Sequence, residues 1–383
     1  MRNRLLVPTL GLGQMVAFAS SYYLLGVLAD PMARATGGQP ADLFAALSAA
    51  FLLSAVLTPF AGRAIERRGG RTVLASAHVA FAVALLVMCT AGSPIQLWLG
   101  ITLLGVGMGS GLYGTAFAIL VDLRGTEARR GITAVSLIGA LGGGLGWPIS
   151  RALLEAGDWR LACGSWALAH LLLCTPLTLA LVPRRRKDGG GGISTEAAKP
   201  DRIVWDRRMF QIAGLFAGAW LVSTAMAAHL PRILAGLGMT ATEAAWAAGL
   251  MAISAIVARV VDLVVLQKSH PLTTVRIACL LHPAGAFAAL IGAGKAVVLL
   301  PIGQGLGNGL LSVASGVLPL QIYGPDRYAV RQAMALTPAR YLQAVAPAAF
   351  ALALDASVAT TLALSSTICL AMLLLTLRLT PKA

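Results

Sequence analysis

Long apolar stretches alternate with short polar segments along the whole chain. Twelve of these stretches are nearly free of charge and long enough to cross about 30 Å of hydrocarbon, which takes roughly 20 helical residues. They are Leu6–Ala29, Ala41–Phe60, Thr72–Ala91, Gln96–Val121, Ile132–Leu153, Leu161–Leu181, Phe210–Leu230, Ala241–Leu266, Leu272–Gly292, Ala296–Tyr323, Gln332–Leu354 and Ser357–Leu377. Unpaired backbone amides are costly in lipid, and these unbroken blocks differ from the alternating strands of a barrel. The pattern predicts an all-α membrane protein with twelve transmembrane helices.

The two halves of the chain resemble each other. The glycine row Gly105–Leu112 in the fourth span returns as Gly303–Leu310 in the tenth, a shift of 198 residues. Gly125, Glu127 and Pro148 match Gly324, Asp326 and Pro347 one residue later in register. Duplicated apolar halves are typical of transporters built from parallel repeats. We expect two pseudo-symmetric six-helix bundles, residues 1–182 and 209–383, joined by a polar cytoplasmic linker, 183–208.

Composition and charge support this organisation. Hydrophobic residues make up 57% of the chain and charged residues 12%, which a water-soluble fold could not bury. With the N-terminus inside, and with Arg151, Arg276 and Arg340 counted with the nearest loops, 24 of the 30 Lys and Arg residues fall in cytoplasmic segments, five fall in outer loops, and Arg259 lies within a span. This positive-inside pattern predicts that both termini are cytoplasmic, in an inner membrane. It explains the net charge of +15 by contact with membrane lipids, without a nucleic-acid partner.

A polar loop between the second and third spans carries the clearest motif. It reads Gly62-Arg-Ala-Ile-Glu66-Arg67-Arg-Gly69-Gly-Arg71. This resembles the signature loop of the major facilitator superfamily, with Glu66 in place of the usual Asp, and the resemblance extends to the twelve spans and the central linker. It implies that these charges, together with Asp122 at the inner end of the fourth span, latch the two bundles in the outward-facing state. The alternative is that they are solvated loop charges worth about 0 to 1 kcal/mol per pair.

Arg259 is the principal candidate for binding a substrate. It lies inside the eighth span, where an ionisable group indicates function by default, and its planar fork suits a carboxylate. Asp262 follows at i+3 and allows an ion pair instead. The setting Val257-Ala258-Arg259 is similar to the eighth span of monocarboxylate transporters, where such an arginine binds the anion. Those proteins carry an acidic residue four positions earlier, and here that position is Ala255.

Polar and aromatic residues near the middle of other spans are further candidates for the central site. For each, the alternative is a hydrogen bond between helices or a place in the aromatic belt. Gln304 and Asn308 are favoured because i and i+4 share a helix face. His229 and His282 are candidates for carrying a proton. The remaining candidates are Gln14, Tyr22, Tyr23, Tyr113, Trp220, Ser223, Arg340 and Tyr341.

The sequence contains no nucleotide-binding loop, no nucleophile with a base and no cysteine pair with the spacing of a zinc site. We therefore expect no enzymatic activity, no cofactor and no metal, and no obligate protein partner is evident. The predicted function is secondary active transport of a small solute, a small organic anion if Arg259 binds it, with a coupling ion left open. The alternatives are export of a drug or toxic compound, motivated by the glycine-rich fifth span, and a non-transporting membrane sensor.

Overall fold

The computed structural model describes residues 2–184, 203–292 and 294–379. Most of the predicted linker, 183–208, therefore lies outside the described residues. The helices of the N-terminal half are α1 (Arg2–Ser20), α2 (Leu25–Thr36), α3 (Pro40–Arg68), α4 (Gly70–Cys89), α5 (Pro94–Gly111), α6 (Tyr113–Arg124), η1 (Gly125–Ala128), α7 (Arg129–Ala156), α8 (Trp159–Leu168), η2 (Ala169–Cys174) and α9 (Thr175–Leu181). Those of the C-terminal half are α10 (Arg207–Gly236), α11 (Ala241–Val264), η3 (Leu266–Lys268), α12 (Pro271–Ile291), η4 (Gly294–Val298), α13 (Leu299–Tyr323), α14 (Tyr328–Ala356) and α15 (Val358–Leu377).

Each of the twelve predicted spans corresponds to helix in the structure. By length and composition, 10 helical stretches among the described residues can cross a membrane. One of them, Pro94–Ala156, contains both the fourth and the fifth span, which turn at the short helix η1. The remaining predicted span is α14. The predicted all-α fold of twelve helices agrees with this arrangement.

Three spans are interrupted where the sequence predicts continuous helix. The first span separates into α1 and α2 at residues 21–24, where the Ser21 hydroxyl donates to the Ala17 carbonyl at 2.5 Å. Serine hydroxyls that bind the backbone in this way compete with the helical ladder and bend it. The fourth span breaks at Leu112, whose backbone is extended, at the end of the glycine row. The sixth span contains the π-helical turn η2 between α8 and α9.

The glycine rows allow close packing between helices. A Cβ on Gly105 would collide with the backbone of α3, and one on Gly109 would lie only 3.0 Å from it. A Cβ on Gly305 or Gly309 would collide with the backbone of α11. Small residues at such positions let membrane helices approach closely. Gly105 and Gly305 therefore occupy equivalent positions in the two halves, because α3 and α11 are equivalent helices. In the structure the halves repeat after 200 residues, two more than the shift of 198 that aligns the two glycine rows in the sequence. Only the first row ends in a break, since α13 is continuous.

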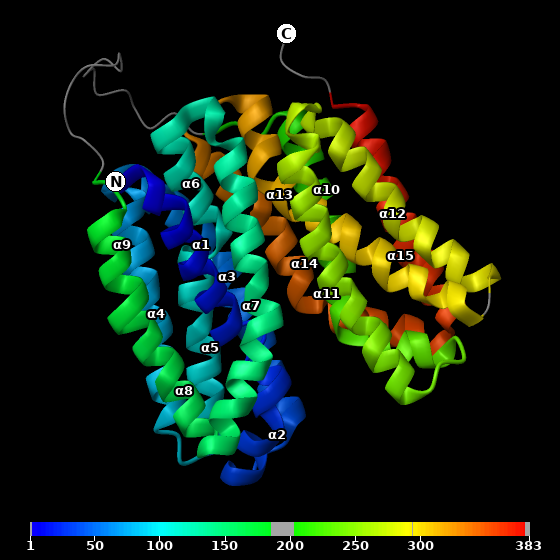
Figure 1. Cartoon of the computed structure of the whole chain (residues 1–383), viewed down its shortest axis with the longest axis horizontal. Helices are drawn as coiled ribbons and strands as arrows, with labels where there is room; N and C mark the ends of the chain where they lie inside the picture. Colours follow the sequence, from blue (N-terminus) through cyan, green and yellow to red (C-terminus); the bar gives the residue numbers. More distant parts are fainter. Residues whose placement is uncertain (1, 185–202, 293, 380–383) are drawn as a thin grey trace.

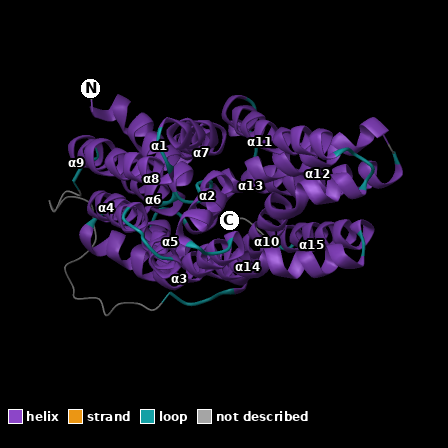
Figure 2. Ribbon diagram, turned by 90° about the horizontal axis from the view of Figure 1, so that it is seen from below, coloured by secondary structure: helices purple, strands orange, loops and turns teal. Residues whose placement is uncertain are grey.

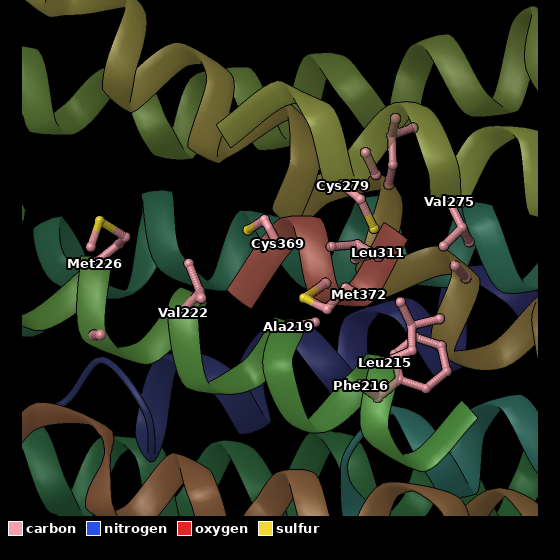
Figure 3. Packing of buried hydrophobic residues seen from close by; sticks show 14 of the residues in the cluster. Leu215, Phe216, Ala219, Val222, Met226, Val275, Cys279, Leu311, Cys369 and Met372 are labelled. Carbon is pink, nitrogen blue, oxygen red and sulfur yellow. The ribbon is translucent and has the colours of Figure 1, made fainter. Parts of the chain in front are cut away.

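Hydrophobic cores form within each half and also between the halves. One core draws on residues between 209 and 379, and a second on residues between 16 and 174. Figure 3 shows the first, where Phe216 and Val222 of α10 lie among side chains that include Cys369 and Met372 of α15. A third core joins the halves, with Phe117 and Ile132 packed together with Val313 and Val317.

The two bundles lie closest at the end that carries both chain termini, called here the terminal end, and the ribbons diverge toward the opposite end (Figure 1). Two seams connect them. Figure 2 shows α3 beside α14 and α7 beside α11, and these two helix pairs are in extensive contact. A site between the bundles is therefore bordered by these four helices.

Candidate functional site

Each seam carries an ion pair between the bundles at the terminal end. At the α3–α14 seam, Arg327 Nε lies 3.7 Å from Glu66 Oε2. At the α7–α11 seam, Arg129 Nη2 lies 3.8 Å from Asp262 Oδ1. The two arginines stand at equivalent places in the repeat, immediately before or at the start of α14 and α7. The pseudo-symmetry of the halves thus places one cross-bundle ion pair on each side of the terminal end.

Arg129 makes the stronger set of contacts. Its guanidinium also donates to the carbonyls of Ser269 and Leu266, both at 2.7 Å, in the turn that follows α11. Asp262 in addition accepts from the Thr133 hydroxyl at 2.8 Å and from the Gln267 amide at 3.2 Å. Arg129 is not among the site residues that the sequence predicts. Its role in the seam depends on residues more than 130 positions away, as the 137-residue separation from Leu266 shows.

The signature loop divides into packing residues and charged residues. A Cβ on Gly62 would lie 2.8 Å from the Ala329 carbonyl oxygen, so glycine permits the close approach of α14 to α3. Gly69 ends α3 with a φ of 82°, a conformation that favours glycine. Arg71 donates to the Leu179 carbonyl within the N-terminal bundle. Arg67 and Asp122 are exposed and make no ion pair with described residues.

Arg259 lies in α11 and is 6% exposed. Its Nε donates to the Ser136 hydroxyl of α7 at 3.0 Å, across the seam, and its Nη1 donates to the Ala255 carbonyl at 2.7 Å. Ala255, which stands where monocarboxylate transporters carry an acidic residue, thus binds Arg259 through its backbone oxygen. Tyr23 and Tyr113 of the N-terminal bundle lie close enough to interact electrostatically with the guanidinium.

The structure does not pair Arg259 with Asp262. The Asp262 carboxylate is turned toward Thr133, Gln267 and Arg129, as described above. No carboxylate in the described ranges lies within 4.0 Å of Arg259. A position at i+3 allows an ion pair, but here the neighbouring α7 offers Asp262 better partners. Arg259 is therefore a buried cation without an acidic neighbour.

Aromatic side chains of the N-terminal bundle surround this region. The Tyr113 hydroxyl donates to the Ser136 carbonyl at 3.0 Å, and its ring stacks on Phe117. Tyr22 and Tyr23 lie in the break between α1 and α2, with ring centroids 6.2 Å apart. The glycine row of α7 makes room for these rings, since a Cβ on Gly139 would lie 2.7 Å from the Tyr113 oxygen. The fifth span therefore uses its glycines for packing.

Gln14 connects the two broken spans. Its amide nitrogen donates to the Gly111 carbonyl at 2.8 Å, immediately before the break at Leu112, and the side chain is fully buried. Its Oε1 atom has no hydrogen-bond partner among the described residues. Gln14 thus has one polar atom left for a ligand or a water.

The favoured pair in the tenth span does not act together. Gln304 is buried beside His282 of α12, whereas Asn308 accepts a hydrogen bond from Ser223 of α10 at 3.0 Å. The i and i+4 positions share a broad face, but Gln304 contacts α12 and Asn308 contacts α10. Trp220 is half-buried and packs edge-to-face on Phe216 within the C-terminal core.

The remaining histidine and tyrosine candidates lie inside the C-terminal bundle or on its surface. His229 Nε2 is 2.8 Å from the Pro347 carbonyl, and His282 Nε2 is 2.8 Å from the Ser365 hydroxyl. Tyr341 is 43% exposed. None of these three contacts the region around Arg259 in the described structure.

Arg340 lies at the α3–α14 seam, where it lines a cavity between the bundles. The sequence places it inside the eleventh predicted span, and in the structure it lies near the middle of α14. It lines a small cavity of about 30 Å³ at the α3–α14 seam, with Gly62, Thr115 and Gln332. It makes no hydrogen bond or ion pair with the residues that the structure describes. Tyr22 lies close enough to interact with its charge. A second arginine thus faces the tyrosine cluster from the other seam.

Comparison with known proteins identifies the family. The model described as Major Facilitator Superfamily matches residues 10–337. A protein of Thermoproteus tenax, described as an uncharacterized 38 kDa protein in the 23S RNA operon, is 29% identical over 316 residues, which are 81% of this chain and 78% of that protein.

Several solved structures share the fold at low identity. The human organic anion transporter MFSD10 (TETRAN) is 15% identical with a TM-score of 0.73, covering 97% of this chain and 99% of that one. The transporter FucP in the outward conformation is 14% identical with a TM-score of 0.74, covering 96% and 97%. The proton:xylose symporter XylE is 12% identical with a TM-score of 0.73, covering 98% and 95%. The chain belongs to the Major Facilitator Superfamily, a family of transporters and not of enzymes, and it is a multi-pass membrane protein with that family's fold.

Proposed function

We propose that this transporter carries a small organic anion in the space between its two bundles, with Arg259 as the residue that binds the anionic group. The observation that carries the proposal is that Arg259 is a buried guanidinium with no carboxylate within 4.0 Å in the described structure. Burying a charge without a counterion is costly. A carboxylate substrate would supply that counterion, and the guanidinium fork favours a carboxylate over a neutral solute.

Arg340 supports the same proposal from the other seam. It is half-buried and also lacks an ion-pair partner among the described residues. The neighbours of the two arginines include three tyrosines of the N-terminal bundle, which are neutral and can donate hydrogen bonds to an anion. MFSD10 is itself described as an organic anion transporter, but at 15% identity that likeness shows the fold alone, so the proposal rests on the arginines.

The proposed mechanism is alternating access by rocking of the bundles. The terminal end is closed in this structure by the pairs Glu66–Arg327 and Arg129–Asp262 and by the core that the halves share. The basic residues of the terminal end favour a cytoplasmic location in an inner membrane, by the positive-inside rule. The structure then corresponds to a state closed toward the cytoplasm. Breaking these pairs would open the site inward, and a gradient of an ion or a solute would drive uphill movement.

Ligand-induced thermal stabilisation of the purified protein tests the proposal. A ligand that binds only the folded protein raises its melting temperature by mass action. Small carboxylates are expected to raise Tm, whereas neutral sugars and hydrophobic drugs are not. In Arg259→Gln the affinity for the same carboxylates is expected to fall about 10- to 100-fold, because a hydrogen bond to a charged group is worth about 1.5–3 kcal/mol.

Arg276→Gln is the matched control. Arg276 is a half-buried arginine of the same bundle, but it lies on α12 and donates to the Thr376 carbonyl at 3.0 Å. Its replacement should leave the carboxylate-induced shift unchanged relative to its own baseline. Stabilisation of wild type by hydrophobic drugs and not by carboxylates would refute the proposal and favour export of such compounds.

A further inference from the structure

A second cluster of polar side chains lies inside the N-terminal bundle, away from both seams. It consists of His78 on α4 and of His170 and Cys174 at the two ends of the π-helical turn η2. All three residues are buried, and their ligand atoms lie within 4.8 Å of one another. Neither the transport site nor the seams use any of them.

The two histidines are already in contact. His78 Nδ1 lies 3.1 Å from His170 Nδ1. Two nitrogen ligands bound at about 2.0 Å to one metal ion lie roughly 3.3 Å apart in tetrahedral geometry, and slightly farther apart in trigonal geometry. The observed separation is close to that distance. The present contact is a hydrogen bond in which one of the two Nδ1 atoms carries a proton. When that histidine carries its proton on Nε2 instead, both Nδ1 lone pairs can bind one ion.

The surroundings of His170 fit a metal ligand. Its second nitrogen, Nε2, lies 2.8 Å from the Ser20 hydroxyl of α1. Histidines that bind metals commonly donate their other ring N–H to an oxygen, which fixes the tautomer and the ring orientation. With Nε2 bonded to Ser20, Nδ1 is the nitrogen left to face His78 and Cys174.

A histidine nitrogen that is unpaired in the described structure, and a π-helical turn, also mark this cluster. His78 Nε2 is a buried nitrogen without a hydrogen-bond partner among the described residues, so the network around the cluster is incomplete as it stands. The single π turn also interrupts an otherwise α-helical span at the cluster, and such turns are frequent at functional sites. It begins one residue before His170 and ends at Cys174.

We propose that His78, His170 and Cys174 bind one Cu(I) ion. Thiolate favours soft ions such as Cu(I) and also Zn(II), and imidazole binds both copper and zinc, so Cu(I) and Zn(II) are the main choices. Metal binding replaces the proton on the Cys174 thiol, so that a Cu–S bond forms and the proton leaves. Two neutral imidazoles, one thiolate and Cu(I) give a complex without net charge. Zn(II) with the same ligands would leave one positive charge inside an apolar bundle, which is costly.

The ion would join elements that are distant in the sequence. His78 and His170 are 92 positions apart, and Ser20 is 150 positions from His170. A bound ion would therefore fasten α4 to the span α8–α9, with α1 held through Ser20. Cu(I) is expected to raise the melting temperature of the protein as it binds.

Competition with a chromogenic Cu(I) chelator tests the proposal on the full-length protein, purified in detergent under anaerobic, reducing conditions. Wild type is expected to take one Cu(I) per chain, and Cys174→Ser and His170→Gln should each weaken binding at least 10-fold. X-ray absorption at the copper edge should show two nitrogen neighbours and one sulfur neighbour. This last measurement needs no variant and so does not depend on whether the variants fold.

His282→Gln and Cys279→Ser are the matched controls, because they change a buried histidine and a buried cysteine of α12 in the C-terminal bundle. Both should bind Cu(I) like wild type. The proposal is overturned if wild type takes no Cu(I), if the control variants lose binding as Cys174→Ser does, or if Zn(II) binds more tightly than Cu(I). A first shell without sulfur would overturn it as well.

Discussion

Arg259 depends on partners from both bundles. Its Nε is held by Ser136 of α7 and its Nη1 by a carbonyl of its own helix, so two of its three nitrogens have partners. These hydrogen bonds fix the plane of the guanidinium but provide no negative charge. A carboxylate that entered between the bundles would meet an oriented fork, and less side-chain entropy would be lost on binding.

Gly309 shows how a single methyl group limits the packing of helices. A Cβ at this position of α13 would lie 2.5 Å from the Ala255 oxygen and 2.7 Å from Ala258 Cβ, both on α11. Gly309→Ala should therefore force α13 and α11 apart and destabilise the protein by about 1–3 kcal/mol. A thermal or denaturant melt in detergent measures the loss.

Gly249→Ala is the control for that substitution. Gly249 is an exposed glycine on α11, and a Cβ there meets nothing within 4 Å. Alanine should leave the stability unchanged or raise it by up to about 1 kcal/mol, since it favours helix over glycine. Equal melting temperatures for the two variants would mean that the close contact of α13 with α11 is not limiting.

At the scale of elements, the sequence predicted where helices lie better than where they break. Each predicted span corresponds to helix, because the backbone N–H and C=O groups of a segment in lipid must form their hydrogen bonds within that segment. The break in the fourth span follows a glycine row that the sequence shows, yet the helix with the same row in the tenth span is continuous. Local composition permits a bend, and the packing of neighbouring helices decides whether it forms.

The charged residues of the site illustrate a similar limit. The sequence placed Arg259 inside a span and Glu66 in a loop that resembles a latch, but it could not choose their partners. Asp262 turned to Arg129 and Glu66 to Arg327, over sequence separations that no local pattern reports. Arg340 is one of several candidates inside the predicted spans, and only the three-dimensional path of α14 puts it beside Tyr22.

Reversing one charge of the Glu66–Arg327 pair should weaken closure of the terminal end. In Glu66→Arg two arginines would face each other across the seam, where the pair now lies at 3.7 Å. Since a half-exposed pair is worth about 1 kcal/mol, the open fraction should rise on the order of five-fold. Spin labels on exposed Glu127 and Lys268, one in each bundle and beside the other seam, would report the change as longer distances.

The exchanged double variant Glu66→Arg/Arg327→Glu is the control. It restores opposite charges with their places reversed, so the distances between the labels should return toward those of wild type. If the single variant leaves the distance distribution unchanged, Glu66 and Arg327 do not contribute to closure. In that case the Arg129–Asp262 seam and the apolar core shared by the two halves hold the terminal end.

At the scale of the whole molecule, the duplicated halves explain why one closed end has two similar seams. Arg129 and Arg327 occupy matching places, as do the glycine rows that pack α5 on α3 and α13 on α11. The two bundles converge at the end that carries both termini (Figure 1). The central region, by contrast, is asymmetric. The N-terminal bundle supplies tyrosines and the C-terminal bundle supplies the two arginines, so the halves contribute different chemistry to the space between them.

Counterflow exchange in proteoliposomes tests the central claim most directly, because it requires a binding site that reaches both sides of the membrane in turn. Vesicles with wild-type protein, loaded with an unlabelled carboxylate that stabilises it, are expected to take up the labelled acid. Arg259→Gln should reduce that uptake at least about 10-fold, and Arg276→Gln should not. Exchange by Arg259→Gln at the wild-type rate and affinity would contradict the account.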